Sequence, residues 1–434
     1  MLFKLNLSRT HLVLTTALIL SSTSLSWAKS QLNNQCVLNQ KTQQLSGVQT
    51  SKAFTLASVS KIFTTYWALK QLGPQYRFPH QIWITAVQRD LYDIHIAGSQ
   101  FPFFDRTMFQ FMIAQLNLMG INQINTLTFD ENFEYSSLIR TDSTLAHQNH
   151  DPTPNEIMKD LRFDAKNITT GFTALKAKSA ALDQTNWPSQ IKISIGDIHF
   201  VSSTEFQASS SSKKVMLSSA PLYRVLKEMN RNSNNFVADK IFEKLSQAQT
   251  FQNFMSAQFG MTKDDIELLN GSGYPIEDTQ SKFYNSGSCS AVTQVLSKMT
   301  ELLNKNNLGL HDVLSVAGLD SPADGKSTVS LMYSSSMTEK TLVGKTGTVA
   351  TTVTLAGLLL TQSGNLFFHT SYAVNDNIND RNQARNSIKQ WIESLIAKNG
   401  KKALDSYQPK SFLPFDHISE IRTSPFTSVI TGRF

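Results

Sequence analysis

The sequence predicts a mixed α+β fold, in which an antiparallel sheet flanked by helices is interrupted by a smaller inserted α+β module. Three observations lead to this prediction. Apolar residues recur at helical spacing near both ends of the chain, strand-like segments gather in two blocks at 83–129 and 341–374, and a serine-rich run at 202–212 separates the blocks. The expected boundaries are residues 29–72 and 213–434 for the split domain and residues 73–212 for the insert.

The first 28 residues are typical of a secretory signal. Lys4 and Arg9 precede a short apolar core at Leu12–Leu20, and Ser26-Trp27-Ala28 places small residues at the two positions that determine cleavage. The apolar core is too short to span a bilayer comfortably. We therefore expect export with cleavage near Ala28, and an uncleaved N-terminal anchor is the alternative.

The split domain is expected to open with a helix that starts near Leu56 and ends at Gly73-Pro74, because its apolar residues recur at helical spacing. Further helical patterns are found at Leu222–Leu245 and Ala291–Asn304. The closing elements are expected to be strands at Thr341–Val343, Thr352–Leu360 and Leu366–Val374, followed by an amphipathic helix at Arg381–Lys398.

The insert mixes strand-like and helical patterns. A helix at about 107–119 has Asp105 as its candidate N-cap and Gly120 at its end. A polar, irregular stretch at 135–167 then leads to a second helix near 172–182. The strands are expected at Trp83–Val87, Leu91–Ile96 and Leu127–Phe129, with a hairpin of Ile191–Ile195 and Ile198–Val201 turning on Gly196-Asp197.

Ser58-Val59-Ser60-Lys61 places a hydroxyl and an amine three residues apart, on one face of the first helix. Serine is a weak nucleophile until a neighbouring base takes its proton, and a lysine can do this when burial or nearby positive charge lowers its pKa. The same spacing also occurs at Ser26/Lys29, Ser210/Lys213 and Ser211/Lys214. Only Ser58 begins an amphipathic helix, so we predict Ser58 as the nucleophile and Lys61 as its leading candidate base.

Two later motifs offer polar groups for a substrate. Ser233-Asn234-Asn235 places a hydroxyl and an amide on a tight turn in a helical context, although Ser363-Gly364-Asn365 fits the same pattern as an ordinary loop. Lys345-Thr346-Gly347-Thr348 places a cation and hydroxyls on a strand, which suits a carboxylate, and Gly347 lets a backbone approach closely. Taken alone, this second motif also fits an edge strand with a solvated lysine.

The three motifs in this order form the signature of β-lactamases and penicillin-binding proteins. The chain resembles the low-molecular-mass penicillin-binding proteins of the D-alanyl-D-alanine carboxypeptidase/endopeptidase type over about residues 36–78 and 213–390. The matching stretches are Leu72–Phe78, Ser233–Lys240, Asn270–Gly273 and Val316–Asp320. The long insert between Ser58 and Ser233 is a family feature, and ordinary β-lactamases lack it in their catalytic domain.

The resemblance implies a penicillin-binding transpeptidase/β-lactamase-like domain in a periplasmic hydrolase that needs no cofactor. Such an enzyme cuts peptidoglycan stem peptides or cross-links through an acyl-enzyme on the serine, is inhibited covalently by β-lactams, and can associate peripherally with the cell envelope. Carried onto this chain, Ser58 attacks with Lys61 as base, Ser233 relays a proton, Asn235 orients the peptide, Lys345 and Thr346 hold its carboxylate, and the N–H groups of Ser58 and Thr348 form the oxyanion hole.

Two departures from the family pattern bear on the insert and the substrate. Ala97–Pro102 stands where the family carries a glycine-rich stretch, and Asn270 replaces an aspartate. The insert also looks shorter than in the best-known members. Two alternatives therefore stay open, a β-lactamase and a catalytically silent wall-binding relative.

Composition narrows the function further. The net charge is +7, and it becomes +5 when Lys4 and Arg9 are removed with the signal. The chain contains no dense basic run with interleaved aromatic residues, so we do not expect it to bind nucleic acid. Cys36 and Cys289 could pair in an oxidising compartment or remain separate buried thiols. His147, His150 and Asp151 could be read as metal ligands, but we expect no metal site there. Phe101, Phe103 and Phe104 could form a sugar-stacking surface, but we expect them to pack inside the insert.

Overall fold

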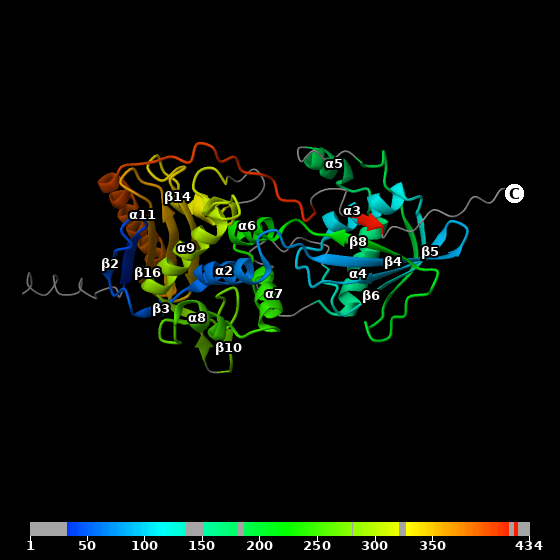
Figure 1. Cartoon of the computed structure of the whole chain (residues 1–434), viewed down its shortest axis with the longest axis horizontal. Helices are drawn as coiled ribbons and strands as arrows, with labels where there is room; N and C mark the ends of the chain where they lie inside the picture. Colours follow the sequence, from blue (N-terminus) through cyan, green and yellow to red (C-terminus); the bar gives the residue numbers. More distant parts are fainter. Residues whose placement is uncertain are drawn as a thin grey trace, which may run out of the picture.

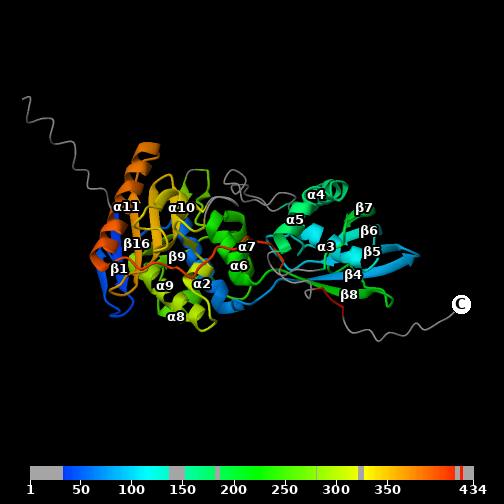
Figure 2. The same cartoon turned by 90° about the horizontal axis from the view of Figure 1, so that it is seen from above.

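The fold is described from a computed structural model, which describes residues 33–135, 152–180, 186–279, 281–320, 327–415 and 421–423. The predicted signal, together with His147, His150 and Asp151, lies outside the described residues. The described part contains two six-stranded sheets, and α6 and α7 lie between them (Figures 1 and 2). The predicted α+β fold is confirmed.

The first sheet is antiparallel throughout and has the order β13-β14-β15-β16-β1-β2. Its central strand β15 is buried along its whole length, because α9 packs on one face of the sheet and α11 on the other. Apolar side chains therefore line both faces of the strand, which explains its almost continuous apolar run. The bounds are β1 (Asn33–Asn39), β2 (Leu45–Val48), β13 (Ser315–Val316), β14 (Leu342–Val349), β15 (Thr352–Leu359), β16 (Leu366–Ala373), α9 (Cys289–Asn304) and α11 (Ile378–Asn399).

A layer of helices packs beside this sheet around α2 (Ser60–Leu72), which is buried from Ser60 to Leu69. Trp67 on α2 lies against the rings of Phe242, Phe251 and Phe254, at centroid distances of 5.3, 5.6 and 5.7 Å. The layer is completed by α6 (Leu222–Asn232), α7 (Asn235–Ser246) and α8 (Phe251–Phe259). The helical pattern predicted at Leu222–Leu245 is confirmed as two helices. The tight turn predicted at Ser233-Asn234-Asn235 separates them, because Ser233 adopts a left-handed conformation with φ +55° that ends α6.

The second sheet has the order β17-β8-β4-β5-β6-β7, and its β5–β6 and β6–β7 pairs are parallel. The predicted hairpin on Gly196-Asp197 is wrong, since those residues lie within one strand, β7, beside β6. The bounds are β4 (Pro79–Gln88), β5 (Leu91–Ala97), β6 (Gln123–Phe129), β7 (Ser194–Phe200), β8 (Lys213–Ser218), β17 (Ile421–Thr423), α3 (Arg106–Leu118), α4 (Pro154–Lys166) and α5 (Phe172–Ala180).

Side-chain N-caps set where two helices of this module begin. Asp105 is the N-cap of α3, where its carboxylate accepts a hydrogen bond from the Met108 N–H at 3.0 Å, as predicted. The prediction of irregular structure at 135–167 is wrong for α4, which starts with a capping box of Thr153 and Glu156. Phe101, Phe103 and Phe104 are buried, so their predicted role in packing is confirmed.

The boundary expected at residue 212 falls too early. β8 starts at Lys213 and pairs with β4, and the late strand β17 pairs with β8, so both segments assigned to the split domain belong to the second sheet. This pairing satisfies backbone groups along an edge of β4 that would otherwise be open. A strap at residues 401–415 leads back from α11 toward the module, where Phe415 stacks on Phe111 at 3.9 Å between ring centroids.

Cys36 on β1 and Cys289 at the start of α9 form a disulfide, which settles the question that the sequence left open. The bridge joins positions 253 residues apart and ties α9 to the sheet that it covers. No helix in the described part of the chain has the length and apolar character needed to cross a membrane.

Candidate active site

Ser58 lies in a short 3-10 turn (Ala57–Val59) directly before α2, and the chain enters this turn through a left-handed Ala57 with φ +46°. Such a conformation is strained for a residue with a side chain, and it occurs mostly where the surroundings hold it in place. Here two glycines pack against the turn. A Cβ on Gly347 would lie 2.8 Å from the Leu56 carbonyl oxygen, and one on Gly273 would lie 1.8 Å from that of Ala57. The close approach predicted for Gly347 is therefore confirmed.

Lys61 is fully buried one turn after Ser58. Its Nζ lies 3.1 Å from Ser58 Oγ, 2.7 Å from Asn235 Oδ1 and 2.8 Å from the Ser272 carbonyl oxygen. Burial lowers the pKa of Lys61 to about 7, against a smaller opposing effect of the Asp239 charge. A neutral amine has two N–H groups for the two carbonyl-type acceptors, and its lone pair then faces the Ser58 hydroxyl. This is the arrangement that a general base requires.

Asp239 is a site residue to which the sequence analysis assigned no role. It lies on α7 one turn after Asn235, and its Oδ1 accepts a hydrogen bond from the Ser272 N–H at 2.8 Å. Burial raises the pKa of its carboxyl to about 6, while the Lys61 charge acts in the opposite direction. The i, i+4 spacing from Asn235 was the signal that could have identified it.

The break between α6 and α7 positions the second motif. Ser233 ends α6, the Asn234 side chain caps α7 by accepting from the Val237 N–H, and Asn235 begins α7. Because Asn235 Oδ1 accepts from Lys61, its amide N–H groups remain for a substrate carbonyl. A continuous helix would have turned Ser233 and Asn235 to different sides.

Lys345 is fully buried on β14 and donates to Ser233 Oγ at 2.9 Å and to the Thr346 carbonyl oxygen at 2.8 Å. Burial, together with the positive charge of Lys61, holds the pKa of Lys345 well below its usual value. Lys345 therefore contacts the proposed proton relay directly. Thr346 and Thr348 of the same strand line the pocket, whereas Lys345 itself lies behind it.

The pocket in front of Ser58 has a volume of about 360 Å³, which suits a small ligand. Its lining includes Arg381, whose guanidinium pairs with Asp376, and the Glu277–Lys282 ion pair at 2.7 Å. These charged residues come from distant segments of the sequence, so no local motif marks them as parts of one site. The lining comprises Ser58, Asn232, Ser233, Asn235, Gly273, Tyr274, Pro275, Glu277, Lys282, Tyr284, Thr328, Met332, Thr346, Thr348, Val349, Ala350 and Arg381.

The strand β14 presents an edge to this pocket. Its pairing with β13 covers only Val343 and Gly344, and among the described residues no strand pairs with Lys345–Val349 on that side. An extended peptide could add to such an edge through main-chain hydrogen bonds. The described residues include no group of three or more His, Cys, Asp or Glu arranged to hold a metal ion.

Comparison with known proteins adds independent findings. The model of the D-Ala-D-Ala carboxypeptidase 3 (S13) family matches residues 31–194 and 193–395. The Bd3459 predatory peptidoglycan endopeptidase from Bdellovibrio bacteriovorus is 32% identical, with a TM-score of 0.82 over 91% of this chain and 99% of that chain. It has also been solved acylated by penicillin G, in complex with an immunity protein, at 33% identity and a TM-score of 0.81 over the same shares.

A more distant structure shares the fold. Penicillin-binding protein 4 from Haemophilus influenzae, solved with a β-lactam, is 16% identical with a TM-score of 0.58 over 86% of this chain and 98% of that chain. No curated protein sequence matches the chain.

Proposed function

The chain belongs to the D-Ala-D-Ala carboxypeptidase 3 (S13) family of serine peptidases, and on this premise we propose that it is chiefly an endopeptidase of peptidoglycan cross-links. Removal of a terminal D-alanine is the second candidate activity. One observation carries the choice: besides Thr346 and Thr348, the pocket is lined by Val349, Ala350 and Arg381, and β13 leaves the edge of β14 unpaired beyond Gly344. A lining that includes these further residues suits a leaving group larger than a single amino acid.

In the proposed acylation step, the neutral amine of Lys61 takes the proton of Ser58 as Oγ attacks the substrate carbonyl. The N–H groups of Ser58 and Thr348 stabilise the oxyanion, where each such donor is typically worth on the order of a hundredfold in rate. Ser233, held by Lys345, relays the proton that Lys61 took from Ser58 to the leaving amine as the peptide bond breaks, so Lys61 is neutral again. Water then attacks the ester, and Lys61 takes a proton from the water and returns it to Ser58 Oγ as the ester bond breaks.

The substrate carboxylate is assigned mainly to hydroxyls and a distant guanidinium. Thr346, Thr348 and Arg381 all line the pocket. Arginine pairs well with carboxylates, although here Asp376 shares it. Lys345, to which the sequence assigned the carboxylate, then acts through its hydrogen bond to Ser233.

The remaining parts of the proposal concern the setting of the enzyme. We place it in the periplasm, where cross-linked peptidoglycan is accessible, on the basis of the signal-like segment at residues 1–28. β-lactams are proposed as covalent inhibitors on Ser58, in line with the penicillin-acylated relative. Peripheral association with the cell envelope follows from the substrate.

The test begins with the intact mass of the wild type and Ser58→Ala after incubation with penicillin G. We expect a persistent adduct on the wild type alone. Purified cross-linked dimers and stem pentapeptides are then compared as substrates, and we expect dimers to be cut faster. Faster loss of D-alanine from pentapeptides would reverse the order of the two activities. Rapid penicillin turnover would indicate a β-lactamase, and neither adduct nor cleavage would indicate a silent wall-binding relative.

A further inference from the structure

A second hollow of about 400 Å³ lies along α6, on the part of its surface that does not line the active-site pocket. The helix contributes residues one turn apart, the short 3-10 turn η2 (Leu310–Asp312) contributes His311 and Asp312, and the strap contributes residues 406–412. This volume exceeds the volume of about 360 Å³ of the pocket in front of Ser58, and it falls within the usual range for small-ligand sites.

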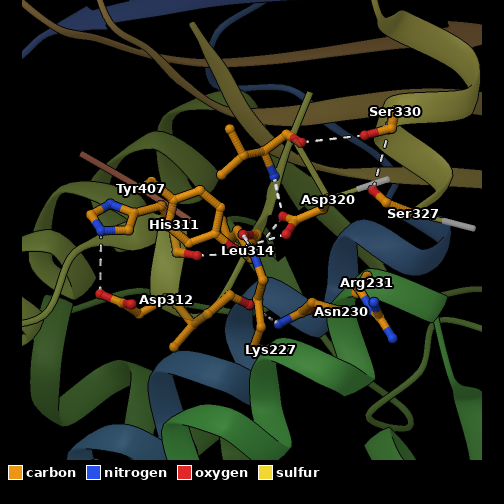
Figure 3. A network of polar contacts seen from close by, with 12 residues as sticks. Lys227, Asn230, Arg231, His311, Asp312, Leu314, Asp320, Ser327, Ser330 and Tyr407 are labelled. Carbon is orange, nitrogen blue, oxygen red and sulfur yellow. Dashed lines mark hydrogen bonds and ion pairs between the residues drawn. The ribbon is translucent and has the colours of Figure 1, made fainter. Parts of the chain in front are cut away.

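Some of the residues that line this hollow are joined by a network of hydrogen bonds and an ion pair (Figure 3). Lys227 reaches from α6 and donates to the carbonyl oxygens of His311 and Leu314 at 2.9 and 2.6 Å and to Asp320 Oδ2 at 2.5 Å. Tyr407 of the strap donates to Asp320 Oδ1 at 2.7 Å. All three N–H groups of the Lys227 ammonium therefore donate to protein acceptors, and its charge is balanced by Asp320. A ligand would have to be bound by the other residues that line the hollow.

The walls carry a surplus of positive charge. Apart from the Lys227–Asp320 pair, the lining contains the cations Arg224, Arg231 and Lys410 against the carboxylates Glu228 and Asp312, which is three against two. Arg231 is only 8% exposed, and its one charged partner among the described residues is Glu228 at 3.0 Å. Its Nε is buried without a hydrogen-bond partner in the described part of the chain. Because Nε has no exposed surface, Arg231 can contribute to the hollow only through its charge and its terminal nitrogens.

The rest of the lining suits an organic ligand rather than a bare ion. The rings of Tyr223, Tyr407 and Phe412 offer apolar contact beside the cations, and Ser406 and Gln408 add polar groups at the strap. Guanidinium groups favour carboxylates because the two match in shape and charge. A molecule with a carboxylate for the cations, amide groups for the polar side chains and a small apolar side chain for the rings would fit this lining.

We propose that this hollow binds a short peptide through its free carboxylate. The choice of a peptide rests on the proposed function, since a peptidase that cuts cross-links releases peptides with a new terminal carboxylate. The site also adjoins the active site: Arg231 lines the hollow and the next residue, Asn232, lines the catalytic pocket. Asn232 Nδ2 donates at 2.7 Å to Glu228, which is the partner of Arg231.

The test uses the full mature protein with Ser58 acylated by penicillin G, so that the catalytic pocket is occupied. Acetyl-L-Ala-D-Ala with a free carboxylate is titrated by calorimetry beside its C-terminal amide. We expect the acid to bind one to one and the amide to bind at least tenfold more weakly. In the double variant Arg224→Gln/Lys410→Gln the acid should lose at least tenfold in affinity, whereas Lys282→Gln, which removes a cation at the rim of the other pocket, should leave it unchanged.

Equal binding of acid and amide, unchanged affinity in the double variant, or no binding at millimolar peptide would each overturn the proposal. The comparison of acid with amide needs no variant, so a folding defect cannot obscure the result. If penicillin fails to acylate Ser58, the proposed function fails by itself. The same titration on Ser58→Ala, with and without the Arg224→Gln/Lys410→Gln changes, then still decides whether the hollow binds the peptide.

Discussion

Two lysines, the fully buried Lys61 beside the catalytic pocket and the largely buried Lys227 in the second hollow, respond differently to burial. Lys61 contacts a hydroxyl, an amide oxygen and a backbone carbonyl, and burial brings its pKa to about 7. Lys227 is also shifted down by burial, but the Asp320 carboxylate in direct contact opposes that shift. A buried lysine among neutral acceptors becomes a base, whereas one against a carboxylate remains a charged structural partner.

The largest expected effect is on Lys61. Lys61→Met removes the base while keeping an unbranched side chain, so the rate of penicillin acylation should fall on the order of a thousandfold. Stopped-flow or mass-resolved acylation kinetics measure this, with circular dichroism to show that the fold persists. Lys227→Met serves as the matched control, and a near-normal rate in Lys61→Met would contradict the assignment of the base.

The second expected effect is on stability, and it concerns Lys227 rather than Lys61. Lys227→Met leaves the Asp320 carboxylate buried without its ion-pair partner, which should lower the free energy of unfolding by about 3–5 kcal/mol. Urea unfolding measures the change. The double variant Lys227→Met/Asp320→Leu should recover most of the loss, because no uncompensated charge remains. A single variant as stable as the wild type would show that Lys227 is not a structural charge.

The pH dependence of acylation sharpens the comparison. Lys61 acts as a base only when neutral, so the rate should rise with pH, with a midpoint at about 7. Asp239 raises the pKa of Lys61, so Asp239→Asn should move the midpoint to lower pH and raise the relative rate at pH 6 several-fold. A profile measured from pH 5 to 9 on both proteins tests this, and a shift to higher pH would be the wrong sign.

The smallest expected effect is at the strap. Tyr407→Phe removes one hydrogen bond to Asp320, which keeps its bonds to Lys227 and the Val316 N–H. The free energy of unfolding should fall by about 1 kcal/mol, and the acylation rate should stay unchanged. Denaturant unfolding and acylation kinetics on the same preparation check both parts. A large loss of rate would mean that the strap supports the catalytic pocket directly.

Prediction from sequence succeeded where the signal is local. Ser58 and Lys61 are three residues apart, in the 3-10 turn and the first turn of α2 that follows it, the Asp105 cap lies beside its helix, and the strands near the end of the chain are continuous apolar runs. It failed where pairing with distant segments decides the structure. Residues 194–200 form one strand because β6 pairs with them, and residues 213–218 join the second sheet because β4 pairs with them.

The sequence by itself determined the fold class, the order of the three motifs and the choice of Ser58 as the proposed nucleophile, because each depends on residue types at short spacing. Only the tertiary structure decided the state of the site. The acceptors that surround Lys61 come from positions 174 and 211 residues away, and Cys36 meets its partner 253 residues later. Burial sets the pKa of Lys61, and burial exists only when the separated segments pack together. The second hollow has the same origin, because α6, the 3-10 turn η2 and the strap become neighbours only in the folded chain.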